Sequence, residues 1–361
     1  RARANPIMAT AELCETSGAS KGWTVIGWMG ALAGLVILSF YTVIAGWTLE
    51  YVQSALTGKF AGLTGDTSQA LFNSLLADNS KMLQWHTIFT LMTMAILALG
   101  VTRGLEASVR LMMPLLFVLL LILLGYAMVE GEFVTSLRFM FSFNPEDVSW
   151  ESALTAMGHS FFTLSLGMGA IMAYGAYMPS NQSVGQTVML VALLDTLVAL
   201  VAGVAIFALV FATPGISVGS GPGLMFVTLP VAFGNMSAGL VIGSVFFVMV
   251  MLAAWTSTIS LLEPGVAYLN ERFGLNRIAA SVLLAVIAWL MGLGSVWSFN
   301  DWSDKQFLWG KSYFDSMDFI ATNIMLPLGG VLIALFVGWK LRDEHLLHEL
   351  KFESSLLLKI W

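Results

Sequence analysis

The sequence predicts an all-α polytopic membrane protein, and three observations support this fold class. Hydrophobic residues make up 58% of the chain and charged residues only 11%, whereas soluble domains carry about 25% charged residues. The mean hydropathy of +0.83 comes from repeated apolar stretches and not from a single anchor. Each stretch approaches the roughly 20 residues that a membrane-crossing helix needs. The net charge of −6 gives no indication of a nucleic-acid partner.

Four apolar segments in the first half of the chain predict membrane helices. They are Trp23–Leu49, Leu83–Val101, Ser108–Val129 and Ala153–Met178. Each holds about 19 to 27 residues, enough to cross the apolar core of a bilayer. The fourth differs from the others because glycines and hydroxyl residues interrupt its centre.

The second half of the chain repeats this pattern four times. Its apolar segments are Thr187–Ala212, Ala238–Leu269, Ala279–Val296 and Met317–Trp339. The final residues, Phe352–Trp361, predict the start of a ninth helix. We expect all of these helices to form one transmembrane domain over residues 1–361, with both ends of the chain truncated.

The interrupted segment is the most informative part of the sequence. Within Phe161–Ala170, Gly167 and Gly169 stand close to the hydroxyl residues Thr163 and Ser165. Backbone freed from a helix at membrane depth is tolerated where it is buried in protein or lines a cavity. Broken helices of this kind form the solute sites of secondary transporters. The alternative is a pair of glycines that allows close helix packing.

The distribution of basic residues predicts the orientation of the chain. Most of them fall on the side that we assign to the cytoplasm: Arg1, Arg3, Lys21, Arg103, Arg110, Arg272, Arg277, Lys340, Arg342 and Lys351. The single cysteine, Cys14, excludes an intramolecular disulfide framework, and the four histidines show no zinc-binding spacing. No organic cofactor is expected.

Three residues of the segment Ala238–Leu269 predict a cation site. Ala253, Thr256 and Ser257 stand at positions i, i+3 and i+4, so they share one helix face. Two hydroxyl oxygens and one carbonyl there form half of an all-oxygen cage for a small hard cation. The alternative is that both hydroxyls only bond back to carbonyls of their own helix.

Asp195 is the most unusual charge in the sequence, because it lies inside the apolar segment Thr187–Ala212. A carboxylate at membrane depth is costly and marks a functional site by default. We expect a bound cation or a proton to neutralise it.

Several stretches together resemble the neurotransmitter:sodium symporter family, especially its bacterial amino-acid transporters. They include Phe161–Ala170, Phe40–Trp47, Phe226–Pro230 and Ala253–Thr258. The resemblance covers essentially the whole chain and implies the leucine-transporter-like fold of two inverted five-helix repeats. It aligns the chain with helices 3 to 10 and the start of helix 11, with helices 1 and 2 absent.

The resemblance also implies the residues that bind sodium and substrate. Thr163 and Asp195 match a first sodium site, and Ala253, Thr256 and Ser257 match a second. The positions that match the substrate pocket are Ile37, Tyr41, Phe162, Ser165, Met168, Ser257 and Leu261. Tyr41 corresponds to the tyrosine whose hydroxyl holds the substrate carboxylate, and Phe162 to an aromatic lid.

Four further residues match gating positions of the family. Asp318 matches the extracellular gate acid, whereas Tyr177, Glu263 and Glu271 match a cytoplasmic network. Glu263 replaces a glutamine of the leucine transporter, so its hydrogen bonds are expected to differ.

These observations predict a sodium-coupled symporter that imports neutral hydrophobic or aromatic amino acids across a prokaryotic plasma membrane by alternating access. Chloride-independent bacterial relatives also carry an acid on helix 7, which predicts chloride independence with proton counter-movement. The alternatives are a proton-coupled permease of the same fold and a receptor-like member that no longer transports. An intramembrane hydrolase is disfavoured, because the segments contain no serine–histidine or paired-aspartate motif. The sequence leaves the oligomeric state open.

Overall fold

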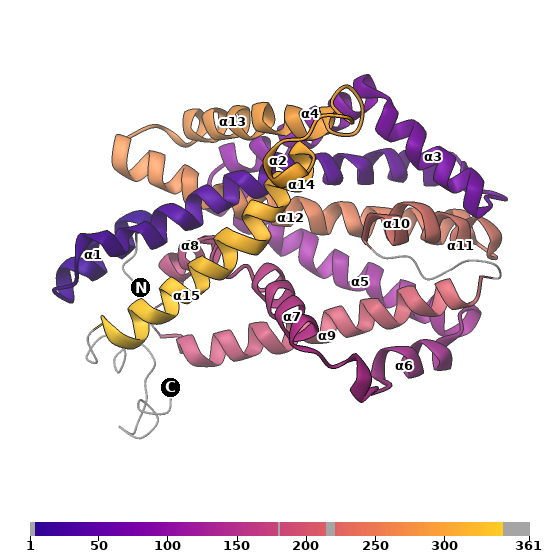
Figure 1. The fold of residues 1–361 in the computed structure, drawn as a ribbon, viewed down its shortest axis with the longest axis horizontal. Helices are drawn as coiled ribbons and strands as arrows, with labels where there is room; N and C mark the ends of the chain where they lie inside the picture. Colours follow the sequence, from indigo (N-terminus) through magenta and orange to yellow (C-terminus); the bar gives the residue numbers. More distant parts are fainter. Residues whose placement is uncertain (1–3, 180, 214–220, 342–361) are drawn as a thin grey trace.

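The computed structural model describes residues 4–179, 181–213 and 221–341, and every regular element in these residues is a helix (Figure 1). The α-helices are α1 (Pro6–Thr16), α2 (Val25–Leu56), α3 (Gly65–Ala77), α4 (Asn79–Ala98), α5 (Ala107–Glu130), α6 (Phe133–Phe141), α7 (Trp150–Thr163), α8 (Ala170–Tyr177), α9 (Val184–Phe211), α10 (Gly221–Gly223), α11 (Leu229–Asn235), α12 (Gly239–Phe273), α13 (Arg277–Trp297), α14 (Tyr313–Phe319) and α15 (Leu326–Trp339). Short 3₁₀ or π turns are η1 (Lys21–Thr24), η2 (Val101–Glu106), η3 (Pro145–Asp147), η4 (Leu224–Thr228), η5 (Leu308–Gly310) and η6 (Ile320–Met325).

Within the described residues, six helical spans are long and apolar enough to cross a membrane. Six of the eight predicted segments correspond to them. The segment predicted at Leu83–Val101 forms the 20-residue α4, whose first half is more polar. The segment predicted at Ala153–Met178 is divided into α7 and α8. The predicted ninth helix, Phe352–Trp361, lies outside the described residues.

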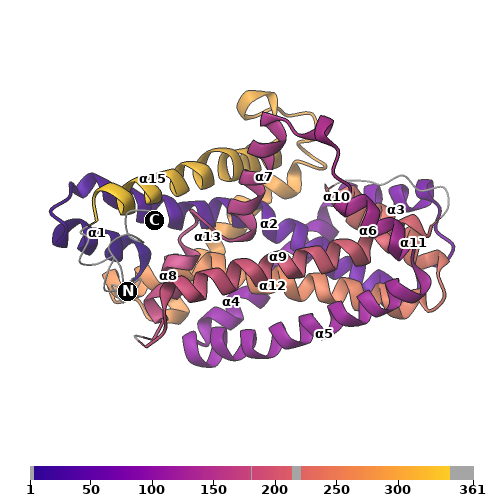
Figure 2. The same ribbon diagram turned by 90° about the horizontal axis from the view of Figure 1, so that it is seen from below.

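Two long helices, α2 and α12, run through the middle of the molecule (Figures 1 and 2). They pack against each other more extensively than any other pair of elements. On one side, α4 and α13 pack against α2, and on the other side α5 packs against both α12 and α9. The largest buried cluster joins α2 to α12 and includes Trp47, Tyr51, Phe226 and Phe247. The two central helices therefore form the scaffold on which the other elements are placed.

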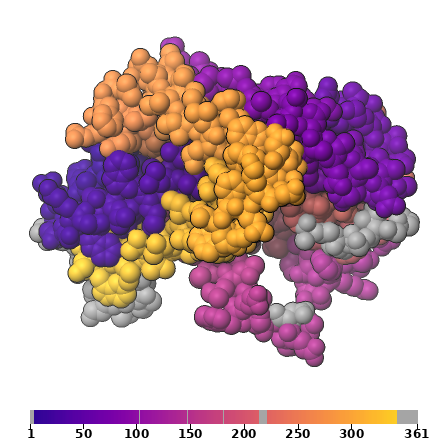
Figure 3. Space-filling view, turned by 45° about the horizontal axis from the view of Figure 1, so that its top comes forward, coloured from indigo at the N-terminus to yellow at the C-terminus, as the bar shows by residue number. Residues whose placement is uncertain are grey.

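The outer helices α5 and α9 keep apolar faces that no other described element covers. Only 11% of the most apolar window of α9 is buried, and Met189 in this helix is 72% exposed. Because these side chains are apolar, lipid is the environment that suits them. The helix α7 has no fully buried residue, and Figure 3 shows the magenta segment that contains it standing away from the body of the molecule.

The sequence placed the end of the second helix at Val101, but α4 ends at Ala98. Gly100 adopts a φ of +92°, a left-handed conformation that favours glycine. The chain then forms the π-helical turn η2, which leads directly into α5. Leu105 and Glu106 at the end of this turn line the central cavity described below.

Candidate functional site

The interruption predicted within Phe161–Ala170 is present, because α7 ends at Thr163 and α8 begins at Ala170. Between them, Ser165, Gly167 and Gly169 have φ values of +55°, +79° and +75°. This left-handed backbone cannot continue an α-helix. The two short helices therefore meet at an irregular segment, residues 164–169, which we call the broken segment.

Close packing against neighbouring backbone also favours glycine in and beside the broken segment. A Cβ atom on Gly167 would lie 2.6 Å from the carbonyl oxygen of Leu326, at the start of α15. At Gly169 it is the facing glycine of α2 that packing requires, because a Cβ atom on Gly30 would be 2.8 Å from the Gly169 amide nitrogen. A Cβ atom on Gly169 itself would meet nothing closer than 3.4 Å, so its positive φ is what favours glycine there. Close packing thus accounts for Gly167, and the helix break accounts for both glycines.

One face of α2 forms a stripe that leads into the site. Gly30, Gly34, Ile37 and Tyr41 are spaced by four, three and four residues, so they share this face. A Cβ atom on Gly34 would lie 2.6 Å from the Leu261 carbonyl oxygen, so the backbones of α2 and α12 touch there. Ile37 and Tyr41 follow where the cavity opens. Ile37 and Tyr41 were predicted from the sequence, whereas Gly30 and Gly34 were not.

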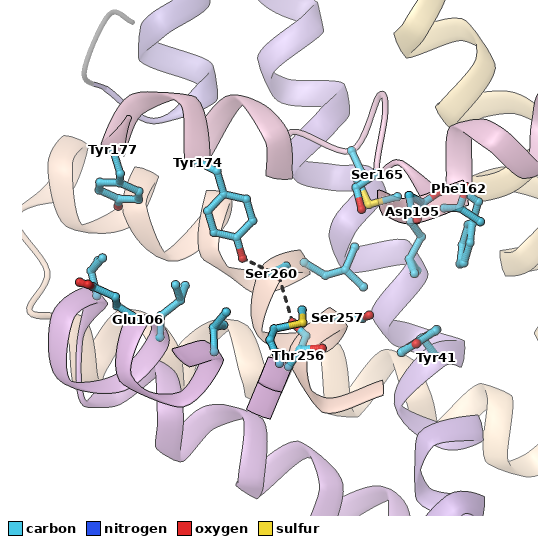
Figure 4. A pocket seen from close by; sticks show the side chains of 18 of the residues that line it. Tyr41, Glu106, Phe162, Ser165, Tyr174, Tyr177, Asp195, Thr256, Ser257 and Ser260 are labelled. Atoms are coloured by element: carbon cyan, nitrogen blue, oxygen red, sulfur yellow. Dashed lines mark hydrogen bonds between the residues drawn. The ribbon is translucent and has the colours of Figure 1, made fainter. Parts of the chain in front are cut away.

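All seven residues predicted for the substrate pocket line a single cavity of about 930 Å³ (Figure 4). They come from α2, from α7 with the broken segment, and from α12. Ile37, Met168 and Leu261 are almost fully buried, and together they give the cavity an apolar wall. Sequence positions more than 200 residues apart are thus brought to one place.

The cavity extends further than the seven predicted residues, to polar groups that were not predicted from the sequence to line it. In Figure 4, Glu106 and Tyr177 lie at the opposite end from Tyr41 and Phe162. Between the two ends, the hydroxyl of Ser260 donates to the carbonyl oxygen of Thr256 over 3.0 Å. The hydroxyl of Tyr174 therefore donates to the Ser260 oxygen, because that serine has no second proton to give.

The three residues predicted for the second sodium site form one hydrogen-bonded unit. The Ala253 carbonyl oxygen accepts from the Thr256 hydroxyl at 2.9 Å and from the Ser257 hydroxyl at 3.1 Å. Both hydroxyl protons are therefore used in hydrogen bonds to a carbonyl of the same helix, as the back-bonding alternative expected. Both hydroxyl oxygens still keep lone pairs that can face a cation, and oxygen donors suit a small hard ion. Ser257 also interacts with the hydroxyl of Tyr41.

The side chain of Ala253 faces a second, apolar cavity of about 410 Å³, whereas Thr256 and Ser257 line the first cavity. Among the described residues, no group of three or more His, Cys, Asp or Glu side chains could hold a metal ion. The donor set at this place consists of hydroxyl and carbonyl oxygens only.

Thr163 and Asp195, predicted for the first sodium site, line the same cavity. The Thr163 hydroxyl is exposed and donates weakly to the Ser160 carbonyl at 3.4 Å. The half-buried Asp195 carboxylate makes no hydrogen bond or ion pair within the described part of the chain. Arg110 lines the cavity too, but its guanidinium pairs with Glu106 at 2.6 Å.

The structure brings two of the predicted gate residues, Tyr177 and Glu263, together. The Tyr177 hydroxyl donates to a Glu263 carboxylate oxygen at 3.0 Å. Arg277, at the start of α13, donates to both oxygens of the same carboxylate, at 3.2 and 2.5 Å. From the sequence, Arg277 was predicted only as one of the basic loop residues. Its ion pair with Glu263 spans 14 residues and the break between α12 and α13, so no helical spacing indicates it.

The other two predicted gate residues have different surroundings. Glu271 is exposed and accepts hydrogen bonds from Asn5 instead of joining the Glu263 pair. Asp318 lies half-buried in α14, where its backbone carbonyl accepts from the Thr322 hydroxyl at 2.7 Å. Its carboxylate makes no side-chain hydrogen bond within the residues that the structure describes.

Comparison with known proteins decides the family. Residues 67–359 match the model of the "Sodium:neurotransmitter symporter family". The chain belongs to this family. It is 33% identical to the "Uncharacterized sodium-dependent transporter YhdH" of Bacillus subtilis over 92% of this chain and 73% of that protein. An uncharacterized sodium-dependent transporter of Haemophilus influenzae is 29% identical over 100% of this chain and 80% of its own length.

A solved structure of MhsT in complex with L-phenylalanine is similar in fold as well as in sequence. The TM-score is 0.89 at 38% identity, over 100% of this chain and 81% of MhsT. The family match and this structural match confirm the predicted leucine-transporter-like fold class. Because its relatives are transporters, this member of the sodium:neurotransmitter symporter family is a multi-pass membrane transporter and not an enzyme.

Proposed function

We propose that the protein imports neutral hydrophobic or aromatic amino acids together with sodium across a prokaryotic plasma membrane. The observation that carries this proposal is the single cavity of about 930 Å³, which combines a buried apolar wall with adjacent hydroxyl and carbonyl oxygens. Two comparisons support it. MhsT is described in complex with L-phenylalanine, and the bacterial relatives are described as sodium-dependent transporters.

The two charged ends of a zwitterionic amino acid find complementary groups in this cavity. The Tyr41 hydroxyl donates to the substrate carboxylate, for which it leaves its contact with Ser257. The ammonium group faces the broken segment, where no hydrogen bond within the described residues occupies the carbonyls of residues 164–168. The side chain then lies against Ile37, Met168 and Leu261.

Sodium is the second cargo. Thr256 and Ser257 supply hydroxyl oxygens at the second site, while Thr163 and Asp195 supply oxygens at the first. The hydroxyl pair disfavours a proton-coupled permease, which does not need such ligands. Retention of Thr163, Asp195, Thr256 and Ser257 likewise disfavours a member that no longer transports.

Uptake by the full-length protein in proteoliposomes tests the substrate and the coupling ion together. We expect a sodium gradient to drive uptake of labelled leucine or tryptophan, and unlabelled hydrophobic or aromatic amino acids to displace the label. Lysine and glutamate should compete at least about 10-fold less well, because an unpaired charge in an apolar site costs more than 1 kcal/mol.

Two results would contradict the proposal. Equal displacement by lysine or glutamate would remove the assignment of the apolar wall to the substrate side chain. Uptake that is unchanged when choline or potassium replaces sodium would favour the proton-coupled alternative.

We further propose that transport is chloride-independent and moves protons opposite to sodium, through Asp195. This carboxylate has no basic partner among the described residues, so bound sodium supplies the opposite charge. When sodium leaves, the carboxylate takes up a proton, and the cavity returns without net charge at this position. No chloride ion is then needed.

Replacing Asp195 with asparagine should abolish uptake or make it depend on chloride, the latter when Ala199→Ser supplies a helper hydroxyl one turn later. The measurement is uptake with gluconate in place of chloride, at several internal pH values. The unmodified protein should be indifferent to gluconate and should respond to internal pH. Strong chloride dependence of the unmodified protein would remove this role for Asp195. So would an Asp195→Asn variant with unchanged pH response.

A further inference from the structure

Asn5 joins the short helix α1 to the end of α12. Its side-chain oxygen accepts hydrogen bonds from the backbone N–H groups of Ile7 and Met8, which caps α1. Its side-chain nitrogen and its own backbone N–H both donate to one oxygen of Glu271, at 2.6 and 2.9 Å. Asn5 is only 2% exposed, so the donor side of these bonds is buried although Glu271 itself is exposed.

The surroundings of Glu271 make it depend on these donors. It lies in the last turn of α12, where the helix dipole disfavours a negative charge. It also faces the N-terminal end of α1, an 11-residue helix whose dipole favours an anion. No cationic side chain pairs with Glu271 within the described residues. Within the described residues, the two N–H donors of Asn5 are therefore the only hydrogen-bond donors to this carboxylate.

The contact lies beside the cytoplasmic cluster of Tyr177, Glu263 and Arg277. Glu271 follows Glu263 by eight residues, about two turns, on the same helix α12. Glu263 accepts from the hydroxyl of Tyr177, and Tyr177 lines the central cavity. The contact made by Asn5 and this cluster therefore share the last turns of α12.

The packing of α1 shows what the contact holds in place. A Cβ atom on Gly27 of α2 would lie 2.6 Å from the Ile7 Cα atom, so the backbones of α1 and α2 touch. Further along α1, Cys14 is 1% exposed and packs in a cluster with Ile26 and Phe336. Helix α1 thus reaches α2, α12 and α15 on the same side of the molecule.

We propose that Asn5 is a positioning residue of the transport cycle. It holds Glu271 in place and thereby keeps α1 docked over the cytoplasmic end of the helix bundle. This inference rests on the proposed transport function, because Asn5 can affect a transport cycle only if the protein transports. The docking itself has a readout that needs no transport.

That readout is Cys14. Because the Cys14 thiol lies on the buried face of α1, against Ile26 and Phe336, a maleimide will react with it only when α1 moves away from α2 and α15. The rate is measured on the full-length protein in detergent, and mass spectrometry locates the adduct on the peptide that contains Cys14. The rate reports docking even if the protein carries no amino acid.

Three single variants and one double variant test the contact. Asn5→Ser keeps the helix cap but removes the amide donor, and Glu271→Gln removes the charge. Asn5→Asp keeps the cap and places a second carboxylate opposite Glu271. We expect the labelling rate of Cys14 to rise about 10-fold in Asn5→Ser and Glu271→Gln. Loss of a hydrogen bond to a charged group shifts the equilibrium between docked and undocked α1 by about this factor. The rise should be largest in Asn5→Asp.

The double variant Asn5→Asp/Glu271→Gln rebuilds the bond with donor and acceptor exchanged, and its labelling rate should return to within about threefold of the unmodified protein. In uptake assays Asn5→Ser should lower the maximal rate and leave KM within about twofold, because it touches no cavity residue. Unchanged labelling in all three single variants would overturn the proposal. Effects that simply add in the double variant would overturn it as well. If uptake is absent in the unmodified protein while labelling follows this pattern, the transport function fails and the docking contact stands.

Discussion

Replacing Thr256 and Ser257 together with alanine will raise the sodium concentration for half-maximal uptake by about 100-fold. The hydroxyls of these residues share the Ala253 carbonyl as acceptor and present their oxygens to the cavity. A hydrogen bond or ligand contact to a charged partner contributes roughly 1.5–3 kcal/mol, and two such losses reach about 3 kcal/mol. The measurement is uptake as a function of sodium at saturating amino acid.

A matched control lies on the same helix. Thr258 is fully buried, but its hydroxyl contacts Thr93 on α4 at 2.8 Å and does not line the cavity. Thr258→Ala should leave the sodium dependence within about threefold, because the two neutral hydrogen bonds that it loses, with Thr93 and with the Trp255 carbonyl, lie away from the ion. Equal sodium shifts in the two variants would show that α12 was merely disturbed. A KM for the amino acid that rises as much as the sodium requirement would also contradict the assignment.

Arg277→Met will lower the stability of the protein by about 3–5 kcal/mol, which is the usual cost of leaving one partner of a buried ion pair alone. The Glu263 side chain is 1% exposed and accepts both guanidinium bonds. Without Arg277, the Tyr177 hydroxyl is the only donor to it that remains among the described residues. Thermal unfolding of the purified protein should show a midpoint lower by on the order of 10 °C.

The pair should respond asymmetrically to substitution. Arg277 keeps 19% exposure of its side chain, so Glu263→Gln leaves a cation that still reaches water and should cost less. The double variant Glu263→Gln/Arg277→Met should recover most of the loss, because it leaves no unpaired charge. A Glu263→Gln variant that is less stable than Arg277→Met would contradict this account of the pair.

The fold was predictable because a membrane restricts the chain to helices, and each helix that crosses it needs a long apolar stretch that the sequence shows. The central helices α2 and α12 are examples, since each contains such a stretch. The short helices α1, α3, α6 and α11 were missed. They lie outside the long apolar segments, so hydropathy carries no signal for them. The polar first half of α4 shows the same limit, because a helix covered by neighbours need not be uniformly apolar.

The candidate site was predictable where residues recur at helical spacing or match a family motif. Tyr41, Thr256 and Ser257 are of this kind, and they line the same cavity. Arg277 and Asn5 were not predictable, because their partners Glu263 and Glu271 depend on how separate helices pack. The polar bridge from Tyr174 to Ser260 was missed for the same reason, since 86 residues separate its members.

The two glycines of α2 also bear on how substrate choice can change during evolution. At Gly30 and Gly34 the backbone of α2 contacts the backbone of Gly169 and Leu261 directly, so neither position has a side chain whose size could change the width of the pocket. Any larger residue would push α2 away from the broken segment or from α12. Selection for a larger or smaller amino acid should therefore act on side chains that line the cavity, such as Ile37, Phe162 and Met168. Relatives with different substrates should accordingly differ at these lining positions while glycine stays at positions 30 and 34.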